Sequence, residues 1–293
     1  MSTGPLQKHF SIITVFAFSV AGMLASGLFL LPGMVFHKVG NASVLVYLTA
    51  GILILPTLFS KAELATAMPR AGGAYYFIDR SMGSMMGTVA GIGTWLSLIF
   101  KSSFDLIGIG AYLLLFITLP IKPVAVGLCI GFGLLAITGS KNAGRVQEIL
   151  VGLLLIALMY FIIMGILSLD MSTVHITAPP NTNIFLEAVG LVYVSFASLT
   201  KVVSVAEEVT DLETNIPWGM FASIGITIVL YLVGILLIDS LVPAETIDGT
   251  LMPVADVAAV ILGTPGVIVI SIAAVLAFAG SANAGLTAAS RYP

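Results

Sequence analysis

The sequence predicts an all-α polytopic membrane protein, built as a bundle of eight transmembrane helices. Hydrophobic residues make up 59% of the 293 residues and charged residues only 9%, and the mean hydropathy is +1.14. An ordinary soluble domain has about 25% charged residues. Because so few charges cannot cover a soluble globule, we expect lipid to surround this chain.

Eight apolar runs are long enough to serve as spans, since a helix needs about 20 apolar residues to cross a hydrocarbon core ~30 Å thick. They cover roughly residues 10–36, 41–67, 84–117, 122–139, 145–168, 184–208, 219–241 and 264–289. The longest polar stretches between them lie around 170–183 and 243–258. We therefore expect a single transmembrane domain over residues 1–293.

Basic residues near the span ends predict the orientation, because cytoplasmic loops carry an excess of lysine and arginine. If the N-terminus is cytoplasmic, two basic residues at span ends, Lys38 and Lys122, lie outside. Six then lie inside: Lys8, Arg70, Arg80, Lys141, Arg145 and Arg291. The sequence thus predicts a multi-pass protein of the plasma membrane with its N-terminus in the cytoplasm.

The first span carries helix breakers near its middle, in the stretch GMLASGLFLLPG of residues 22–33. Glycine costs about 1 kcal/mol and proline about 3 kcal/mol relative to alanine inside a helix. We expect the backbone to be unwound between Gly22 and Gly27, where protein or a water-filled cavity would have to surround it. The alternative is that the small residues let neighbouring helices approach closely.

The span over 184–208 has a weaker interruption of small and hydroxyl residues, VSFASLT, followed by Lys201. Two interrupted helices at corresponding positions of two repeats indicate the binding site of a transporter. We therefore expect broken helices 1 and 6, with the ligand held between them.

Four motifs in order resemble the amino acid–polyamine–organocation permeases. They are GMLASGLFLLPG in helix 1, AELATAMPRAGGAYYFIDRSMG at 62–83, AEEVTDLETNIP at 206–217 and SANAGLTAASRYP at the end of helix 8. The resemblance implies a leucine-transporter-like fold of two inverted five-helix repeats. It implies a secondary active transporter that moves amino acids by alternating access. Repeat 1 would cover about 10–168 and repeat 2 about 184–293.

The chain departs from the family pattern at several places. Ser198, Leu199 and Thr200 stand where many members read G-F-E, and Leu154 stands where some proton-coupled relatives have a lysine. Repeat 2 stops after three helices, which indicates an incomplete second repeat. We therefore expect a C-terminally truncated permease that does not transport by itself.

An amino acid substrate brings a carboxylate and an ammonium group, and both need partners in a site of low dielectric. Ala25, Ser26 and Gly27 would present backbone N–H groups to the carboxylate. The ammonium group would meet carbonyls of Gly22, Met23, Ser195 and Ala197. Ser198 completes this candidate binding site, and Phe196 is either a gate over the substrate or a packing residue.

Charged residues inside the membrane are candidates for coupling and gating by default. Lys101 and Asp105 lie four residues apart and can pair. Lys201 can pair with Glu208, which the resemblance places in the inner gate, or it can sense substrate charge. Ser281 of helix 8 could contribute a hydroxyl to a sodium site, so Na⁺ coupling, H⁺ coupling and exchange all stay open.

Other function classes are less well supported. The net charge of −3 and the pI of 5.5 argue against a nucleic-acid partner. No spacing of His, Asp, Glu or Ser suggests an enzyme, a metal site or a cofactor, and no repeated filter suggests a channel. The substrate gap favours small or apolar neutral amino acids, with polyamines or other organic cations as the alternative.

Overall fold

The computed structural model describes residues 8–70, 72–113, 115–116, 120–137, 140–170, 172, 174–179, 181–243, 250 and 252–292. Regular structure within these ranges is helical, apart from an isolated parallel bridge between Phe10 and Val209. Residues 117 and 138–139, at the ends of two predicted spans, lie outside the described residues.

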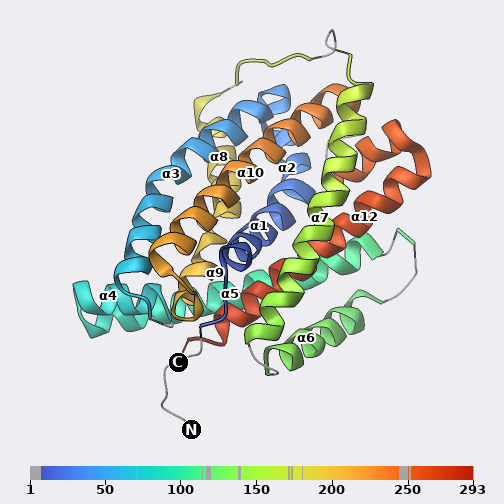
Figure 1. Ribbon diagram of the computed structural model, residues 1–293. Helices are drawn as coiled ribbons and strands as arrows, with labels where there is room; N and C mark the ends of the chain where they lie inside the picture. Colours follow the sequence, from blue (N-terminus) through green and yellow to red (C-terminus); the bar gives the residue numbers. More distant parts are fainter. Residues whose placement is uncertain are drawn as a thin grey trace.

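The helices follow the predicted apolar runs closely (Figure 1). In chain order they are α1 (Ile12–Phe29), α2 (Leu31–Val39), η1 (Gly40–Ala42), α3 (Ser43–Ala67), α4 (Ala74–Met82), α5 (Ser84–Leu113), α6 (Ile121–Ile137), α7 (Ser140–Ser168), α8 (Thr182–Phe196), α9 (Leu199–Ser204), η3 (Ala206–Glu208), α10 (Leu212–Leu241) and α12 (Pro253–Ala289).

Seven helical segments are long and apolar enough to cross a membrane in the described part of the chain. The expected eighth span is α6, whose 17 residues give a length of about 26 Å as straight helix. It is one residue shorter than α1, the shortest of the seven segments. The prediction of eight full spans is therefore corrected to seven spans and one shorter apolar helix.

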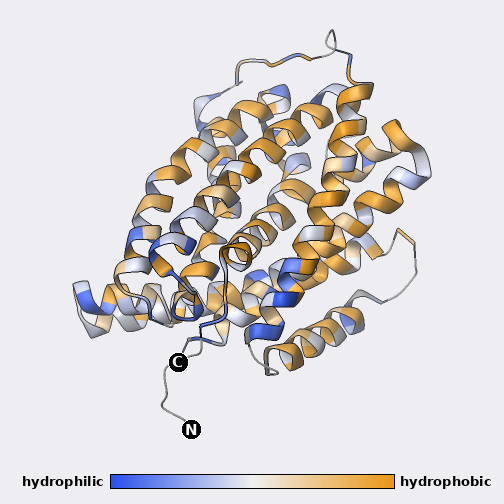
Figure 2. Ribbon diagram, in the orientation of Figure 1, coloured by the Kyte–Doolittle hydropathy of each residue, from blue (hydrophilic) through white to orange (hydrophobic). Residues whose placement is uncertain are grey.

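The helix α1 is the centre of the bundle. Every residue from Ala17 to Phe29 is buried, and α1 packs against α7, α8, α9, α10 and α12. Apolar residues cover most of the bundle (Figure 2), and large side chains such as Phe100 and Ile156 point outward. Apolar groups on the outside and a small-residue helix at the centre are the arrangement that lipid favours.

The predicted unwinding between Gly22 and Gly27 is wrong, because α1 is helical from Ile12 to Phe29. It begins at a capping box in which the Ser11 hydroxyl accepts from the backbone N–H of Thr14. The interruption comes at Leu30 (φ −124°, ψ −47°), just before Pro32 in the first turn of α2. Proline cannot continue a helix but fits its first turn, so it places the break later than the glycines suggested.

The second expected break is a local tightening of the helix. Ala197 (φ −60°, ψ −13°) and Ser198 (φ −57°, ψ −18°) separate α8 from α9 but keep right-handed helical angles. The N–H of Ala197 donates to the Val194 carbonyl and that of Thr200 to the Ala197 carbonyl, both at 3.0 Å. These bonds span three residues instead of four, as in a 3₁₀ turn, so the expected gap between two half-helices is not seen here.

The last helix, α12, contains a kink at Gly263, whose φ of 63° and ψ of −150° lie outside the helical region. Glycine tolerates this conformation because it has no Cβ. The straight part of α12 that follows begins where the sequence placed the start of its last span, at residue 264.

Candidate functional site

A cavity of about 440 Å³ opens between α3, α4, α5 and the turn from α8 to α9. Its charged lining consists of three lysines, Lys61, Lys101 and Lys201, and apart from Leu98 the other lining residues are small or carry a hydroxyl, including Ala197 and Ser198. Four predicted site residues therefore line one cavity: Lys101, Ala197, Ser198 and Lys201.

Two of the lysines reach across the cavity walls to hydroxyl groups. Lys101 Nζ on α5 donates to Ser26 Oγ on α1 at 3.2 Å. Lys61 Nζ on α3 donates to Thr200 Oγ1 on α9 at 2.8 Å. Ser26 of α1 is one of the residues predicted to bind the substrate. Its hydrogen bond with Lys101 joins it to a residue that lines the cavity.

The third lysine, Lys201, is buried at the junction of α5, α9 and α12. Its Nζ donates to the carbonyl and to the Oγ of Ser281, each at 2.8 Å. Asp105 Oδ2 lies 3.9 Å from the same Nζ and accepts a short hydrogen bond from Ser281 Oγ. Lys201, Ser281 and Asp105 thus form one buried polar group, with 1%, 0% and 0% of their surfaces exposed.

The structure corrects both pairings expected from spacing. In the described part of the chain, Asp105 pairs with Lys201 instead of Lys101, and Glu208 pairs with Arg291 instead of Lys201. The turn at Val205 ends α9 before Glu208, so Lys201 and Glu208 do not share a continuous helix. Spacing along one helix could not reveal that α12 brings Ser281 between Lys201 and Asp105.

Ser198 presents a buried hydroxyl for which the described residues supply no hydrogen-bond partner. A Cβ placed on Gly22 would lie 2.6 Å from Ser198 Oγ and 3.2 Å from Lys201 Nζ. Gly22 is therefore the residue that lets α9 approach α1 this closely. A buried hydroxyl without a partner is costly.

Three tyrosine hydroxyls anchor the backbone of α1. The Tyr231 hydroxyl donates to the Met23 carbonyl at 2.5 Å, and its oxygen lies 3.2 Å from Ser195 Oγ. Tyr47 donates to the Gly27 carbonyl at 2.7 Å and Tyr112 to the Phe29 carbonyl at 2.9 Å.

The sequence analysis missed these tyrosines, although a buried tyrosine in an apolar helix usually finds a hydrogen-bond partner. Two of the remaining candidate residues, Phe196 and Ala25, are buried. Phe196 is fully buried with its ring edge-on to Tyr231, at a centroid distance of 5.4 Å. Ala25 is fully buried in α1.

Comparison with known proteins identifies the family of this chain. The sequence profile described as "Amino acid permease" matches residues 10–293. The chain belongs to the amino acid permease family. This confirms the resemblance to the amino acid–polyamine–organocation superfamily, whose members are transporters and not enzymes, and it identifies a multi-pass membrane protein.

Individual relatives of this permease are distant. It is 25% identical over 290 residues to the inner membrane transport protein YbaT of Escherichia coli, covering 96% of this chain and 67% of that protein. It is 25% identical to cationic amino acid transporter 7 of Arabidopsis thaliana, over 78% of this chain and 44% of the relative. It is 24% identical to the branched-chain amino acid permease BcaP of Lactococcus lactis, over 85% and 60%.

One end of the permease is held together around Glu208. The Glu208 carbonyl accepts from the N–H groups of His9 and Phe10 at 2.9 and 3.0 Å. Its buried carboxylate forms an ion pair with Arg291, Oε1 to Nε 2.7 Å. The segment before α1, the segment after α9 and the segment after α12 therefore meet at this one residue.

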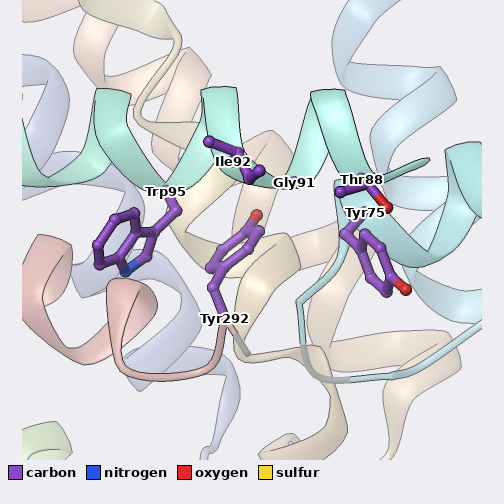
Figure 3. A pocket seen from close by; sticks show the side chains of 6 residues that line it. All are labelled: Tyr75, Thr88, Gly91, Ile92, Trp95 and Tyr292. Atoms are coloured by element: carbon purple, nitrogen blue, oxygen red, sulfur yellow. The ribbon is translucent and has the colours of Figure 1, made fainter. Parts of the chain in front are cut away.

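A second, aromatic pocket of about 290 Å³ lies beside the same end (Figure 3). The ring of Tyr292 points toward α5 between Trp95 and Tyr75, and its hydroxyl lies 3.1 Å from Ser204 Oγ. Burial raises the pKa of the Tyr292 phenol, so this hydroxyl stays protonated. The pocket has no charged lining residue among those described, which distinguishes it from the lysine-lined cavity.

Proposed function

We propose that this permease is a secondary active transporter that moves amino acids by alternating access and holds its substrate in the lysine-lined cavity. The observation that carries the proposal is the buried hydroxyl of Ser198, a residue of the cavity wall, for which no hydrogen-bond partner is found among the described residues. The cavity volume of about 440 Å³ falls within the range of about 300–1,000 Å³ typical of small-molecule sites. The relatives' names, which include a branched-chain and several cationic amino acid transporters, support an amino acid as substrate.

Alternating access requires one part of the bundle to move against another around the site. We assign these parts to an inverted pair of repeats, residues 10–168 and the helices over 184–293. Glu208 acts as a gate, because its contacts join segments from both parts. With the N-terminus cytoplasmic in the plasma membrane, the cavity would lie in the cytoplasmic half, since α9 ends at Ser204, shortly before Glu208, whose carbonyl binds the N-terminal segment at His9 and Phe10.

In this proposal, the residues that couple substrate transport to an ion or to a second substrate are Lys101, Asp105, Lys201 and Ser281. Ser281 Oγ already contacts the Lys201 ammonium group at 2.8 Å. A sodium ion bound to this hydroxyl would lie next to a positive charge, which costs energy in a low-dielectric site. This favours H⁺ coupling or substrate exchange over Na⁺ coupling.

A thermal-shift screen tests the proposed site. The purified protein is heated with each of the twenty amino acids and with spermidine, because a ligand that binds only the folded state raises the melting temperature. We expect at least one amino acid, and not spermidine, to stabilise the protein. Three lining lysines argue against polyamines and other organic cations.

The substitution Gly93→Leu tests whether the substrate binds in this cavity. Gly93 lines the cavity, and a Cβ added there meets no atom within 4 Å, so leucine can fill the space without disturbing the fold. The matched control is Gly152→Leu on α7, where the added Cβ also meets nothing. Amino acid binding should be lost in the first variant and kept in the second. Unchanged binding by Gly93→Leu would place the site elsewhere.

A further inference from the structure

The charge of the cavity lining suggests which amino acids it accepts. Lys61, Lys101 and Lys201 bring three ammonium groups to its wall, whereas no Asp or Glu lines it among the described residues. A cavity inside a membrane protein is poorly screened, so unbalanced charge there is costly.

Only one of the three positive charges has a carboxylate partner. Asp105 lies behind Lys201, 3.9 Å from its Nζ. In the part of the chain that the structure describes, the hydrogen bonds of Lys61 and Lys101 go to neutral hydroxyls, those of Thr200 and Ser26. Within the described residues no salt bridge joins either lysine to an acidic side chain.

Both lysines keep hydrogen-bonding capacity for a ligand. An ammonium group has three donors, and one hydrogen bond is found for Lys61 and one for Lys101. The two groups come from different walls, α3 and α5, so one ligand can meet both through separate groups. Ser198 Oγ, buried and without a partner in the described structure, can accept from an ammonium group or donate to a carboxylate.

We infer that the substrate of this cavity is an acidic amino acid, such as glutamate or aspartate. Its two carboxylates match the two unpaired lysines, and its net charge of −1 reduces the excess positive charge. A neutral amino acid leaves that excess unchanged and a cationic one increases it. The inference rests on the proposed function and departs from the neutral substrate that the apolar helix 1 residues suggested.

Competition binding tests this inference. Radiolabelled L-glutamate is bound to the purified protein in lipid nanodiscs and displaced by unlabelled L-glutamate, L-leucine or L-lysine. We expect glutamate to displace the label at concentrations at least about tenfold lower than leucine, and lysine to fail, because losing a buried charge partner has at least this effect.

Variants assign the preference to the cavity. Of Lys61→Gln and Lys101→Gln, the variant that removes the partner of the side-chain carboxylate should reduce the preference for glutamate over leucine about tenfold or more without weakening leucine binding. The other variant removes the partner of the α-carboxylate, which leucine shares, and should weaken the binding of both ligands. Lys101→Arg should keep the preference. The control is Lys38→Gln, which removes a lysine on the surface, where Lys38 pairs with Glu187 at 2.7 Å. It should leave the preference unchanged.

The outcomes separate the two proposals. If leucine or lysine binds more tightly than glutamate in the unmodified protein, or if both glutamine variants keep the full preference, the inference of an acidic substrate is overturned and the proposed function stands. If no amino acid binds, the proposed function fails and this inference fails with it.

Discussion

Replacing Gly27 with alanine tests how α1 is held in the bundle. A Cβ at this position would lie 1.7 Å from the Tyr231 hydroxyl oxygen, 2.4 Å from Tyr231 Cζ and 2.9 Å from Ser195 Oγ. Real Cβ contacts are essentially never closer than 3.0 Å. The tyrosine ring therefore has to move away, although its hydroxyl is held by the Met23 carbonyl at 2.5 Å.

The size of the effect follows from these contacts. Moving the hydroxyl away stretches its bond to Met23 beyond the usual O–H···O range of about 2.5–3.0 Å and forfeits about 0.5–1.5 kcal/mol. Overpacking a well-filled core costs about 1–3 kcal/mol more. The two losses together amount to about 1.5–4.5 kcal/mol, and the better helix propensity of alanine returns about 1 kcal/mol. We therefore expect Gly27→Ala to destabilise the protein by about 0.5–3.5 kcal/mol.

Thermal unfolding of the purified protein measures this loss in three backgrounds. The loss should be largest in the unmodified protein and smaller with Tyr231→Phe, which removes the hydroxyl but leaves Cζ at 2.4 Å. It should be smallest with Tyr231→Leu. Gly190→Ala on α8, where an added Cβ meets nothing within 4 Å, is the control without a loss. An equal loss in all three backgrounds would refute the argument that Tyr231 requires glycine here.

Three further substitutions probe other contacts. Asp105→Asn leaves the buried Lys201 ammonium group without its carboxylate and should lower the free energy of unfolding by about 3–5 kcal/mol. Adding Lys201→Met to this variant should restore a large part of that stability, as measured by unfolding. Arg291→Ala removes the partner of the Glu208 carboxylate, and we expect faster hydrogen exchange of the backbone amides before α1. Unchanged exchange would show that Arg291 does not help to hold this segment against Glu208. Tyr47→Phe removes the hydrogen bond to the carbonyl of residue 27 and should cost about 1 kcal/mol, seen as a lower melting temperature.

The positions of the helices could be predicted from the sequence because each depends on a local property. A run of about 20 apolar residues has few alternatives to a membrane helix, and the predicted spans match α3, α5, α7 and α10 to within several residues. The short α6 shows the limit, since the apolar run over 122–139 contains a helix of 17 residues.

The site could be predicted only in part, because its contacts come from different helices. Lys101, Lys201 and Ser198 were recognised, since charged and hydroxyl residues inside a membrane are unusual. The partners of Lys101 and Lys201 were not, because Ser26 and Ser281 lie 75 and 80 residues away along the chain. Lys61 was not among the predicted site residues, although its side chain reaches Thr200 inside the bundle.

The glycines of α1 mark two faces of one intact helix. Gly22 and Ser26 are four residues apart and so lie on the same side; that side meets Ser198, Lys201 and Lys101. Met23 and Gly27 are also four apart, and their side meets Tyr231.

Small residues on the first side let the cavity groups approach α1, and small residues on the second let a tyrosine ring approach. The same composition that suggested an unwound segment is thus explained by close contacts on both sides of a helix. Substitutions at Gly22 or Ser26 should therefore change ligand binding, whereas those at Gly27 should first change stability.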